Sequence, residues 1–223
     1  MESSRGQLVH RHLGRISWPD AFQIQMTNWQ ALVDGGDQHV LLTLEHDPVV
    51  TLGRRAVREH LLQESELERR GVLIVEADRG GEVTFHGPGQ LVLYLNVGTT
   101  LTQLGPGDLV RALASAIVDD AEQLGIASSY DTAHPGVWVE QRKLAAVGMR
   151  ITRGASLHGA AINVSNDTSV FDLFVPCGMP GTHAVSLHEL GLTHESVESV
   201  ARRLVRAVAA RLRLELTGST FGS

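Results

Sequence analysis

The sequence is poor in several features that define whole classes of protein. It has a single cysteine, Cys177, so no disulfide can form within the chain, and a reducing compartment is expected. No stretch approaches the roughly 20 consecutive apolar residues of a membrane-spanning helix, and the first residues contain no apolar signal segment. The net charge of -6 argues against nucleic acid or an anionic membrane surface as a partner, since both attract basic proteins. We therefore expect a cytoplasmic protein that binds neither a membrane nor nucleic acid.

Lysine is also nearly absent. Of the 19 lysine and arginine residues, one is a lysine, Lys143, and the other 18 are arginines. Genome composition explains such a bias by itself. The position of the one lysine is still informative, because a buried lysine can lose its proton whereas arginine stays charged. Lys143 is therefore a candidate for proton transfer.

The one cysteine lies between residues that shape a loop. Pro176 restricts the backbone before Cys177 and Gly178 frees it afterwards, which favours a sharp loop over a helix or a strand. A nucleophile would be exposed at such a position. A lone cysteine is more often a small buried hydrophobic residue, so this segment alone leaves both interpretations open.

Length and pattern predict a single domain over residues 1–223, of α/β or α+β class, without repeats or linkers. Apolar and alternating runs predict strands over Gln7–Leu13, His39–Glu45, Val49–Leu52, Val72–Glu76, Leu91–Val97, Val137–Glu140, Lys143–Ile151, Ser156–Val164 and Ala184–Leu187. Helical spacing with capping residues predicts helices from Ser17 to Gly35, near Glu59–Arg70, from Pro106 to Gly125 and over Glu195–Leu214.

Residues 79–90 form the part of the chain richest in glycine. The segment matches neither a dinucleotide-binding fingerprint nor a phosphate-binding loop. Its glycines permit either a tight hairpin connection or a close approach of the backbone to a ligand. His86 lies within this segment. A single histidine more often makes structural hydrogen bonds than takes part in catalysis. The eleven histidines of the chain show no metal-ligand spacing, so no metal site is predicted.

Five separate blocks of the sequence resemble one enzyme family. They are Arg79-Gly80-Gly81 with Thr84 and His86-Gly87-Pro88-Gly89-Gln90, Gly136-Val137-Trp138-Val139, Lys143-Leu144-Ala145-Ala146-Val147-Gly148, Leu157-His158-Gly159-Ala160-Ala161-Ile162-Asn163-Val164, and Pro176-Cys177-Gly178. In this order, between about Trp18 and Leu190, they resemble the lipoyl(octanoyl) transferases of lipoate biosynthesis. The resemblance implies the fold of lipoate and biotin protein ligase catalytic domains, a mixed β-sheet core flanked by helices.

The resemblance also implies a reaction and a set of residues. An octanoyl or lipoyl group would pass from acyl carrier protein to a lysine of a lipoyl domain through an acyl-thioester, with Cys177 as nucleophile and Lys143 lowering its pKa. The substrate-binding residues that it implies are Arg79, Gly80, Gly81, Glu82, Val83, Thr84, Phe85, His86, Ala146, Val147, Gly148, Gly159, Ala160 and Ala161. As support for this pocket we add Gly87, Gly89, Gln90, His158 and Asn163. Phe85 and Met179 depart from or vary within the family, so both bear on the preferred acyl chain length.

Elementary electrostatics agrees with a cysteine–lysine pair. Lowering the pKa of a thiol from ~8.5 to ~6.5 requires about 2.7 kcal/mol of stabilisation of the thiolate. An ammonium about 4 Å away contributes about 4 kcal/mol at an effective dielectric constant of ~20. Since the donor is already a thioester and an amide is the more stable product, neither ATP nor a metal nor another cofactor is expected.

The resemblance implies octanoyl-acyl carrier protein as donor and, as acceptors, lipoyl domains of 2-oxoacid dehydrogenase complexes and glycine cleavage H protein; a monomer is expected. Such carriers are commonly acidic, so a basic docking patch is expected. Its candidates are Arg54, Arg55, Arg58, Arg142, Arg150 and Arg153. One alternative is an ATP-dependent lipoate or biotin protein ligase, which has no need of the cysteine in Pro176-Cys177-Gly178. The other is a non-catalytic protein that binds lipoyl domains or acyl groups, and the intact pair of Cys177 and Lys143 counts against it.

Overall fold

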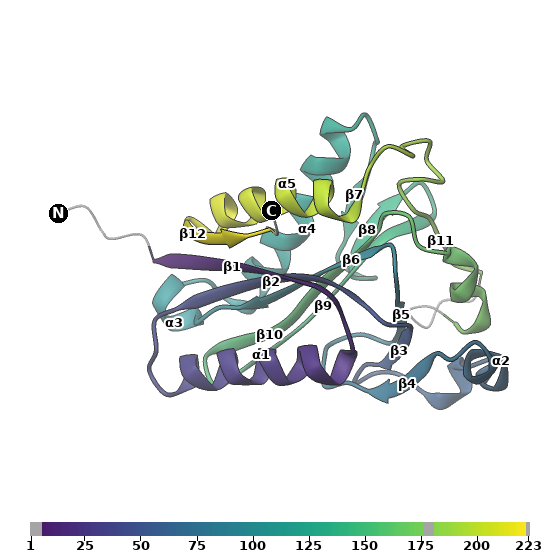
Figure 1. Ribbon diagram of the computed structural model, residues 1–223, viewed down its shortest axis with the longest axis horizontal. Helices are drawn as coiled ribbons and strands as arrows, with labels where there is room; N and C mark the ends of the chain where they lie inside the picture. The colour runs from purple at the N-terminus through teal and green to yellow at the C-terminus, as the bar shows by residue number, and fades with distance from the viewer. Residues whose placement is uncertain (1–5, 176–180, 222–223) are drawn as a thin grey trace.

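A computed structural model describes residues 6–175 and 181–221 of the chain. Its main element is a mixed nine-stranded sheet in the order β12-β1-β2-β6-β10-β9-β8-β7, with β11 paired beside β9 (Figure 1). Its strands are β1 (Gln7–Ile16), β2 (His39–His46), β6 (Gln90–Asn96), β7 (Ser129–Asp131), β8 (Gly136–Val139), β9 (Arg142–Thr152), β10 (Ala155–Asn163), β11 (His183–Ala184) and β12 (Glu215–Thr220). Strands β12, β1 and β2 run parallel, whereas the sheet from β2 to β7 is antiparallel. The expected mixed sheet is confirmed.

Helices cover both faces of this sheet. Helix α1 (Trp18–Val33) lies on one face, and α4 (Pro106–Gln123) and α5 (Val197–Leu212) lie on the other (Figure 1). A short helix, α3 (Thr99–Thr102), follows β6. Helix α1 begins at the predicted N-cap, Ser17, whose hydroxyl accepts a hydrogen bond from the Asp20 amide.

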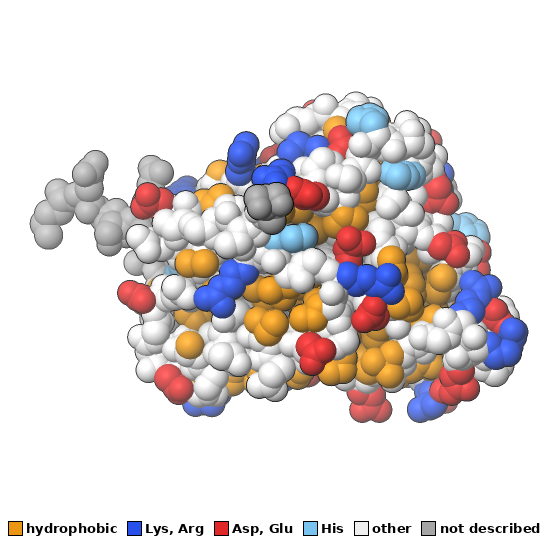
Figure 2. Space-filling view, viewed as in Figure 1, with side chains coloured by type: hydrophobic (Ala, Val, Ile, Leu, Met, Phe, Trp, Pro, Cys, Tyr) orange, Lys and Arg blue, Asp and Glu red, His pale blue; other side chains and the backbone are white. Residues whose placement is uncertain are grey.

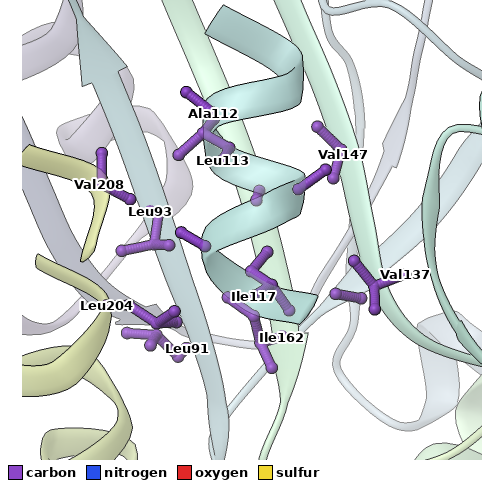
Figure 3. Packing of buried hydrophobic residues seen from close by; sticks show 14 of the residues in the cluster. Leu91, Leu93, Ala112, Leu113, Ile117, Val137, Val147, Ile162, Leu204 and Val208 are labelled. Atoms are coloured by element: carbon purple, nitrogen blue, oxygen red, sulfur yellow. The ribbon is translucent and has the colours of Figure 1, made fainter. Parts of the chain in front are cut away.

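The largest core lies between the main sheet and the helices α4 and α5. Figure 3 shows leucine, isoleucine and valine side chains of the sheet meeting those of both helices. Leu93 on β6 and Leu113 on α4 are fully buried there. Because each fully buried leucine contributes about 1.5–3 kcal/mol, this layer supplies much of the driving force for folding.

A second, three-stranded sheet stands beside the main one. Its order is β4 (Leu73–Glu76), β3 (Val49–Leu52) and β5 (Val83–His86). A separate cluster of buried residues covers it, including Leu67 of α2 (Glu64–Arg69) and Phe171 of the 3-10 helix Thr168–Leu173. Strand β5 is followed by β6 of the main sheet, so residues 87–89 connect the two sheets.

The helix predicted near Glu59–Arg70 is wrong in extent. The structure has a 3-10 turn at Arg58–His60 and only then α2. Between them, the Gln63 amide donates a hydrogen bond to the Leu173 carbonyl, and this tertiary contact replaces the helical one.

Other elements also differ from the prediction, and β7 (Ser129–Asp131) was not predicted. Strand β5 forms within the glycine-rich segment, where no strand was predicted, and the last short strand is His183–Ala184 rather than Ala184–Leu187. The final helix ends at Leu212, because Arg213 adopts a left-handed φ of 57° and the chain turns into β12. β12 was not predicted, because its sequence reads as a polar tail unless its partner β1 is known.

The surface carries charges of both signs. Figure 2 shows acidic and basic side chains scattered over one face, with hydrophobic side chains gathered toward its middle. Within the described residues, no helix is long and apolar enough to cross a membrane. Among the same residues, the large hydrophobic side chains that stand exposed are Val57, Leu62, Leu73 and Leu101.

Candidate active site

A cavity of about 410 Å³ lies where the two sheets meet. Its walls come from β5, β6, β9 and β10 and from three loops, at residues 54–55, 79–82 and 133–135. Every predicted substrate-binding residue except Phe85 lines it, namely Arg79, Gly80, Gly81, Glu82, Val83, Thr84, His86, Ala146, Val147, Gly148, Gly159, Ala160 and Ala161. The side chain of Phe85 belongs to the core of the small sheet, where its ring meets that of Phe171 edge to face.

Strand register explains why the cavity exists. Two rows of residues cross β6, β10 and β9: Val92, Ala161 and Ala146 in one row, and Tyr94, Gly159 and Gly148 in the other. All six line the cavity, and four of them have no side chain beyond Cβ. The room for a ligand is therefore the volume that larger side chains would fill on this face of the sheet.

Glycine is required at both Gly148 and Gly159. A Cβ on Gly159 would lie 2.1 Å from the Leu93 carbonyl oxygen, and one on Gly148 would lie 2.9 Å from that of Gly80. Since the Gly80 amide also donates to the Met149 carbonyl (3.1 Å), the loop at residues 79–82 packs directly on the backbone of β9.

Arg79 holds its own loop against β3. Its side chain is only 8% exposed, and its guanidinium donates to the Thr51 hydroxyl and carbonyl and to the Glu82 carbonyl, each at 2.7 Å for Nη2. A further bond reaches the Gly80 carbonyl at 3.0 Å. Because these acceptors are uncharged oxygens of the protein, the buried guanidinium acts first as a brace for this wall of the cavity.

Lys143 reaches the site because of an irregularity in β9. Trp138 pairs with Lys143 but Val137 pairs with Ala145, so Leu144 is an extra residue on β9. A bulge of this kind reverses the alternation of side chains along a strand. It sets Lys143 and Ala146 on one face although they are three residues apart, and both line a small cavity that adjoins the main one.

The ammonium group of Lys143 is enclosed. The side chain is 6% exposed, Nζ donates to the Pro135 carbonyl at 3.3 Å, and it lies 4.8 Å from the centroid of the Trp138 ring. Thr84, Ala146 and Ala161 line both the small cavity that holds Lys143 and the main cavity. A cation is thus placed beside a largely apolar chamber.

The predicted nucleophile Cys177, and with it Met179, lies outside the described residues. The residues on either side are described. The Val175 amide donates to the His60 carbonyl at 2.8 Å, and β11 runs parallel to β9, with Ala184 beside Lys143. The Val185 amide then donates to the Lys143 carbonyl at 3.0 Å. The chain that follows the cysteine segment therefore passes along the strand of the lysine.

A buried chain of amides links His86 to this same region. His86 Nδ1 lies 2.8 Å from Gln90 Oε1, and Gln90 Nε2 donates to Asn163 Oδ1 at 2.9 Å. Asn163 Nδ2 in turn donates to the carbonyls of Val185 (3.2 Å) and Lys143 (3.4 Å). Burial is the main reason why the pKa of His86 is well below its ordinary value, so the ring is neutral at physiological pH.

Gly87 and Gly89 shape the connection between β5 and β6. A Cβ on Gly87 would lie 2.5 Å from the Phe85 ring, and Gly89 has a φ of +83°. The Gly89 amide donates to Glu45 Oε2 at 2.6 Å. Neither glycine lines the cavity, so both act on its shape through the turn.

His158 enters the site through an unusual backbone conformation. Its φ of 63° is left-handed, which is rare for a residue with a side chain and costs energy. Its ring, 2% exposed, lines the main cavity, with Nε2 2.6 Å from Asp78 Oδ1. The His158 amide donates to the buried Gln25 side chain of α1 at 2.9 Å. These contacts fix a residue that regular alternation would turn to the opposite face of β10.

Asp78 ties three parts of the site together. It accepts from His158 and also pairs with Arg150 on β9, and it directly precedes the Arg79 loop. The hydrogen bond from His158, aided by Arg150, lowers the pKa of Asp78 to about 2. Burial lowers the pKa of His158 despite the opposing effect of Asp78. The cluster therefore anchors the base of the loop at residues 79–82.

Several residues of the site were not predicted. Besides Asp78, they include Trp18, Thr51, Val92 and Tyr94, which line the cavity, and His46, whose Nε2 lies 2.7 Å from the Tyr94 hydroxyl. The sequence feature that could have pointed to them is a polar or aromatic residue within an otherwise apolar strand, as at Tyr94. A lone residue of this kind does not show which face of the sheet it occupies.

The six arginines proposed as a docking patch differ in their contacts. Arg54 and Arg55 stand exposed at the edge of the cavity and line it. The other four have local contacts: Arg58 with Glu64, Arg142 with Glu140 at 3.7 Å, Arg150 with Asp78, and Arg153 over the Trp29 ring at 5.6 Å.

Comparison with known proteins gives one consistent result. Residues 19–209 match the family model of the lipoyl protein ligase A/B catalytic domain. An octanoyltransferase of Koribacter versatilis is 39% identical over 201 residues, covering 86% of this chain and 80% of the relative. One of Laribacter hongkongensis is 37% identical over 202 residues, covering 91% and 94%. Among solved structures, a lipoate-protein ligase A bound with ATP superposes with a TM-score of 0.74 at 18% identity, covering 98% of this chain and 90% of the other.

Proposed function

The chain belongs to the lipoyl protein ligase A/B catalytic-domain family and is an acyltransferase, and from this premise we propose that it transfers octanoyl groups in protein lipoylation. The donor is octanoyl-acyl carrier protein and the acceptor is a lysine amine on a lipoyl domain, as in 2-oxoacid dehydrogenase complexes and glycine cleavage H protein. Cys177 carries the octanoyl group between them as a thioester.

The observation that carries the proposal is the placement of Lys143. The bulge at Leu144 places this single lysine in the small cavity that adjoins the main cavity, and Ala146 and Ala161 line both. Strand β11, shortly after Pro176-Cys177-Gly178 in the chain, pairs with the backbone of Lys143. A buried lysine beside the cavity proposed for the acyl chain supplies the positive charge that favours a thiolate nucleophile.

The reaction balances in two steps. The Cys177 thiolate attacks the donor thioester carbonyl, an enzyme thioester forms, and the carrier's pantetheine sulfur leaves as a thiolate that takes up one proton, which equals the one proton released by the amine in the second step. The acceptor amine then attacks the new thioester, the amide forms and the Cys177 thiolate is released. The amine loses one proton in this second step, and Lys143 is the group proposed to relay it.

The glycine-rich walls suit the acyl chain. With the backbone exposed at Gly148 and Gly159, an unbranched chain can lie close to the sheet. The neutral His86 and the braced Arg79 then serve the shape of the cavity rather than proton transfer.

The test uses apo-lipoyl domain as acceptor, followed by intact-mass spectrometry. Octanoyl-acyl carrier protein without ATP is expected to add one octanoyl group, and replacing the acceptor lysine by alanine is expected to abolish the product. Modification that requires octanoic acid plus ATP, with no product from the thioester donor, would identify a ligase instead. No modification under either condition would favour a binding protein.

A further inference from the structure

A second hollow adjoins the cavity on the outer side. It is an open groove of about 480 Å³ and shares Arg54, Val110 and Met149 with the cavity. Its remaining lining residues are Pro106, Gly107, Arg111, Tyr130, Thr132 and Ile151. We call it the α4 groove, because four of its nine residues belong to the first turns of α4.

The exposure of the lining residues shows that the cavity lies deeper in the protein than the α4 groove. The inner wall of the cavity is buried, as at His86, Val92 and Tyr94, whereas Arg54 and His134 at its edge are exposed. The α4 groove lies on this exposed side, and most of its residues are exposed or half-buried. An apolar chain in the cavity would therefore have its head group at the edge and the rest of its donor in the groove.

The loop at residues 132–135 runs from the α4 groove to the cavity and Lys143. Thr132 lines the groove, residues 133–135 line the cavity, and the Pro135 carbonyl accepts the hydrogen bond from Lys143 Nζ at 3.3 Å. A thioester held beside Lys143 thus lies at the inner end of this loop, and a chain leaving its sulfur can follow the loop outward.

The groove has an apolar floor and a basic rim. Val110, Met149, Ile151 and the Tyr130 ring provide the floor, and Arg54 and Arg111 stand at the rim. Arg111 pairs with Asp108 at 2.6 Å, whereas Arg54 forms no ion pair within residues 6–175 and 181–221.

The Arg54 backbone is held in place from the cavity wall. Its amide donates to the Arg79 carbonyl at 3.1 Å, and the next amide, that of Arg55, donates to the Gly81 carbonyl at 3.1 Å. A Cβ at the preceding Gly53 would lie 2.4 Å from the Gly81 carbonyl oxygen, so this close packing depends on glycine. The backbone that carries the Arg54 side chain is thereby fixed where the cavity and the groove meet.

We propose that the α4 groove binds the phosphopantetheine arm of the acyl carrier protein, with Arg54 beside its phosphate. The arm is an uncharged amide-containing chain with a thioester at one end and an anionic phosphodiester at the other, which matches an apolar floor with a basic rim. The inference rests on the proposed function, because it presumes a thioester donor.

The test compares two small donors, octanoyl-pantetheine and octanoyl-4′-phosphopantetheine, in octanoylation of apo-lipoyl domain. The phosphate is expected to raise kcat/KM about tenfold in the wild type, since one charge-assisted contact at an exposed site is worth about this factor. In Arg54→Gln the ratio of the two kcat/KM values is expected to fall close to one. In the control Arg206→Gln, an equal charge change on the exposed face of α5, the wild-type ratio is expected to persist.

The outcomes separate the two proposals. If no thioester donor octanoylates the lipoyl domain, the proposed function fails. If both donors work but the phosphate has no effect, or Arg54→Gln keeps the wild-type ratio, only the groove assignment is overturned. It is also overturned if Arg54→Gln raises KM for the lipoyl domain alone, which would make the groove an acceptor site. Preference for octanoyl-coenzyme A over octanoyl-acyl carrier protein would overturn the choice of carrier.

Discussion

At the scale of single residues, Lys143 owes its place to one extra residue in its strand and its enclosure to the Trp138 ring and the Pro135 carbonyl. A point charge at this position can support a thiolate, and a lysine can also pass a proton. The two roles are separable by a substitution that preserves the charge.

We therefore predict that Lys143→Arg still allows some acylation of Cys177 but slows transfer to the amine by about a hundredfold or more, the usual scale for loss of general acid–base catalysis. Single-turnover mass spectrometry, with the lipoyl domain added after the donor, measures the two steps separately. The reverse exchange on the exposed face of α5, Arg206→Lys, serves as the control. Transfer at the native rate in Lys143→Arg would rule out the proton relay.

His46 makes stability depend on pH. Burial lowers its pKa from the ordinary 6.5 to about 4, so between these values the unfolded chain binds more protons than the folded one. The contribution of His46 to the free energy of unfolding is fully present above pH 6.5. It is lost as the pH falls toward 4, which lowers the free energy of unfolding by up to about 3 kcal/mol. Urea unfolding at several pH values is expected to show this slope, with a shallower one in His46→Gln. An identical slope in that variant would contradict the assignment.

The family resemblance pointed to most of the residues that line the cavity, but not to the contacts that hold them in place. Asp78 and Gln25 bear no motif, and their roles depend on His158 turning into the left-handed region. Tertiary contacts with Asp78 and Gln25, rather than the local sequence, hold His158 in that conformation. Phe85 lies within a predicted binding stretch but points to the other side of β5, because alternation along the strand decides the face.

At the scale of elements, β8 positions the lysine of the neighbouring strand. A Cβ added to Gly136 would lie 2.4 Å from Lys143 Cε and 2.6 Å from the Ala145 carbonyl oxygen. The lysine side chain can therefore occupy its present place only beside a glycine.

Gly136→Ala is accordingly predicted to displace the ammonium and lower octanoyl transfer at least tenfold, while the protein still folds. The control is Gly105→Ala before α4, where a Cβ would meet only Asp108 Oδ2, at 3.4 Å. Activity and melting temperature are measured together for both variants. Full activity in Gly136→Ala would mean that the exact position of Lys143 is unimportant.

Element boundaries were predictable where local pattern and tertiary role agree. Helix α4 begins at Pro106 as expected, and β3 has its predicted bounds, Val49–Leu52. The break before α2 follows instead from a bond between Gln63 and Leu173, more than a hundred residues apart in the chain. Strand β12 exists because β1 offers it an edge, and no pattern within β12 predicts that.

At the scale of the whole molecule, the proposed single domain requires the two sheets to unfold together. Leu113 belongs to the large core and Leu67 to that of the small sheet, and both are fully buried. Leu113→Ala and Leu67→Ala are each expected to cost about 2–5 kcal/mol and to lower one common transition. Calorimetry that resolves a separate transition, moved by Leu67→Ala alone, would show two domains.

The proposed enzyme thioester has its most direct test in the intact mass of the protein after mixing with octanoyl-acyl carrier protein in the absence of an acceptor. We predict a gain of one octanoyl group that is released by hydroxylamine, disappears on addition of apo-lipoyl domain and is absent from Cys177→Ala. No octanoyl gain in the wild type, or a gain that persists in Cys177→Ala, would contradict acyl transfer through Cys177.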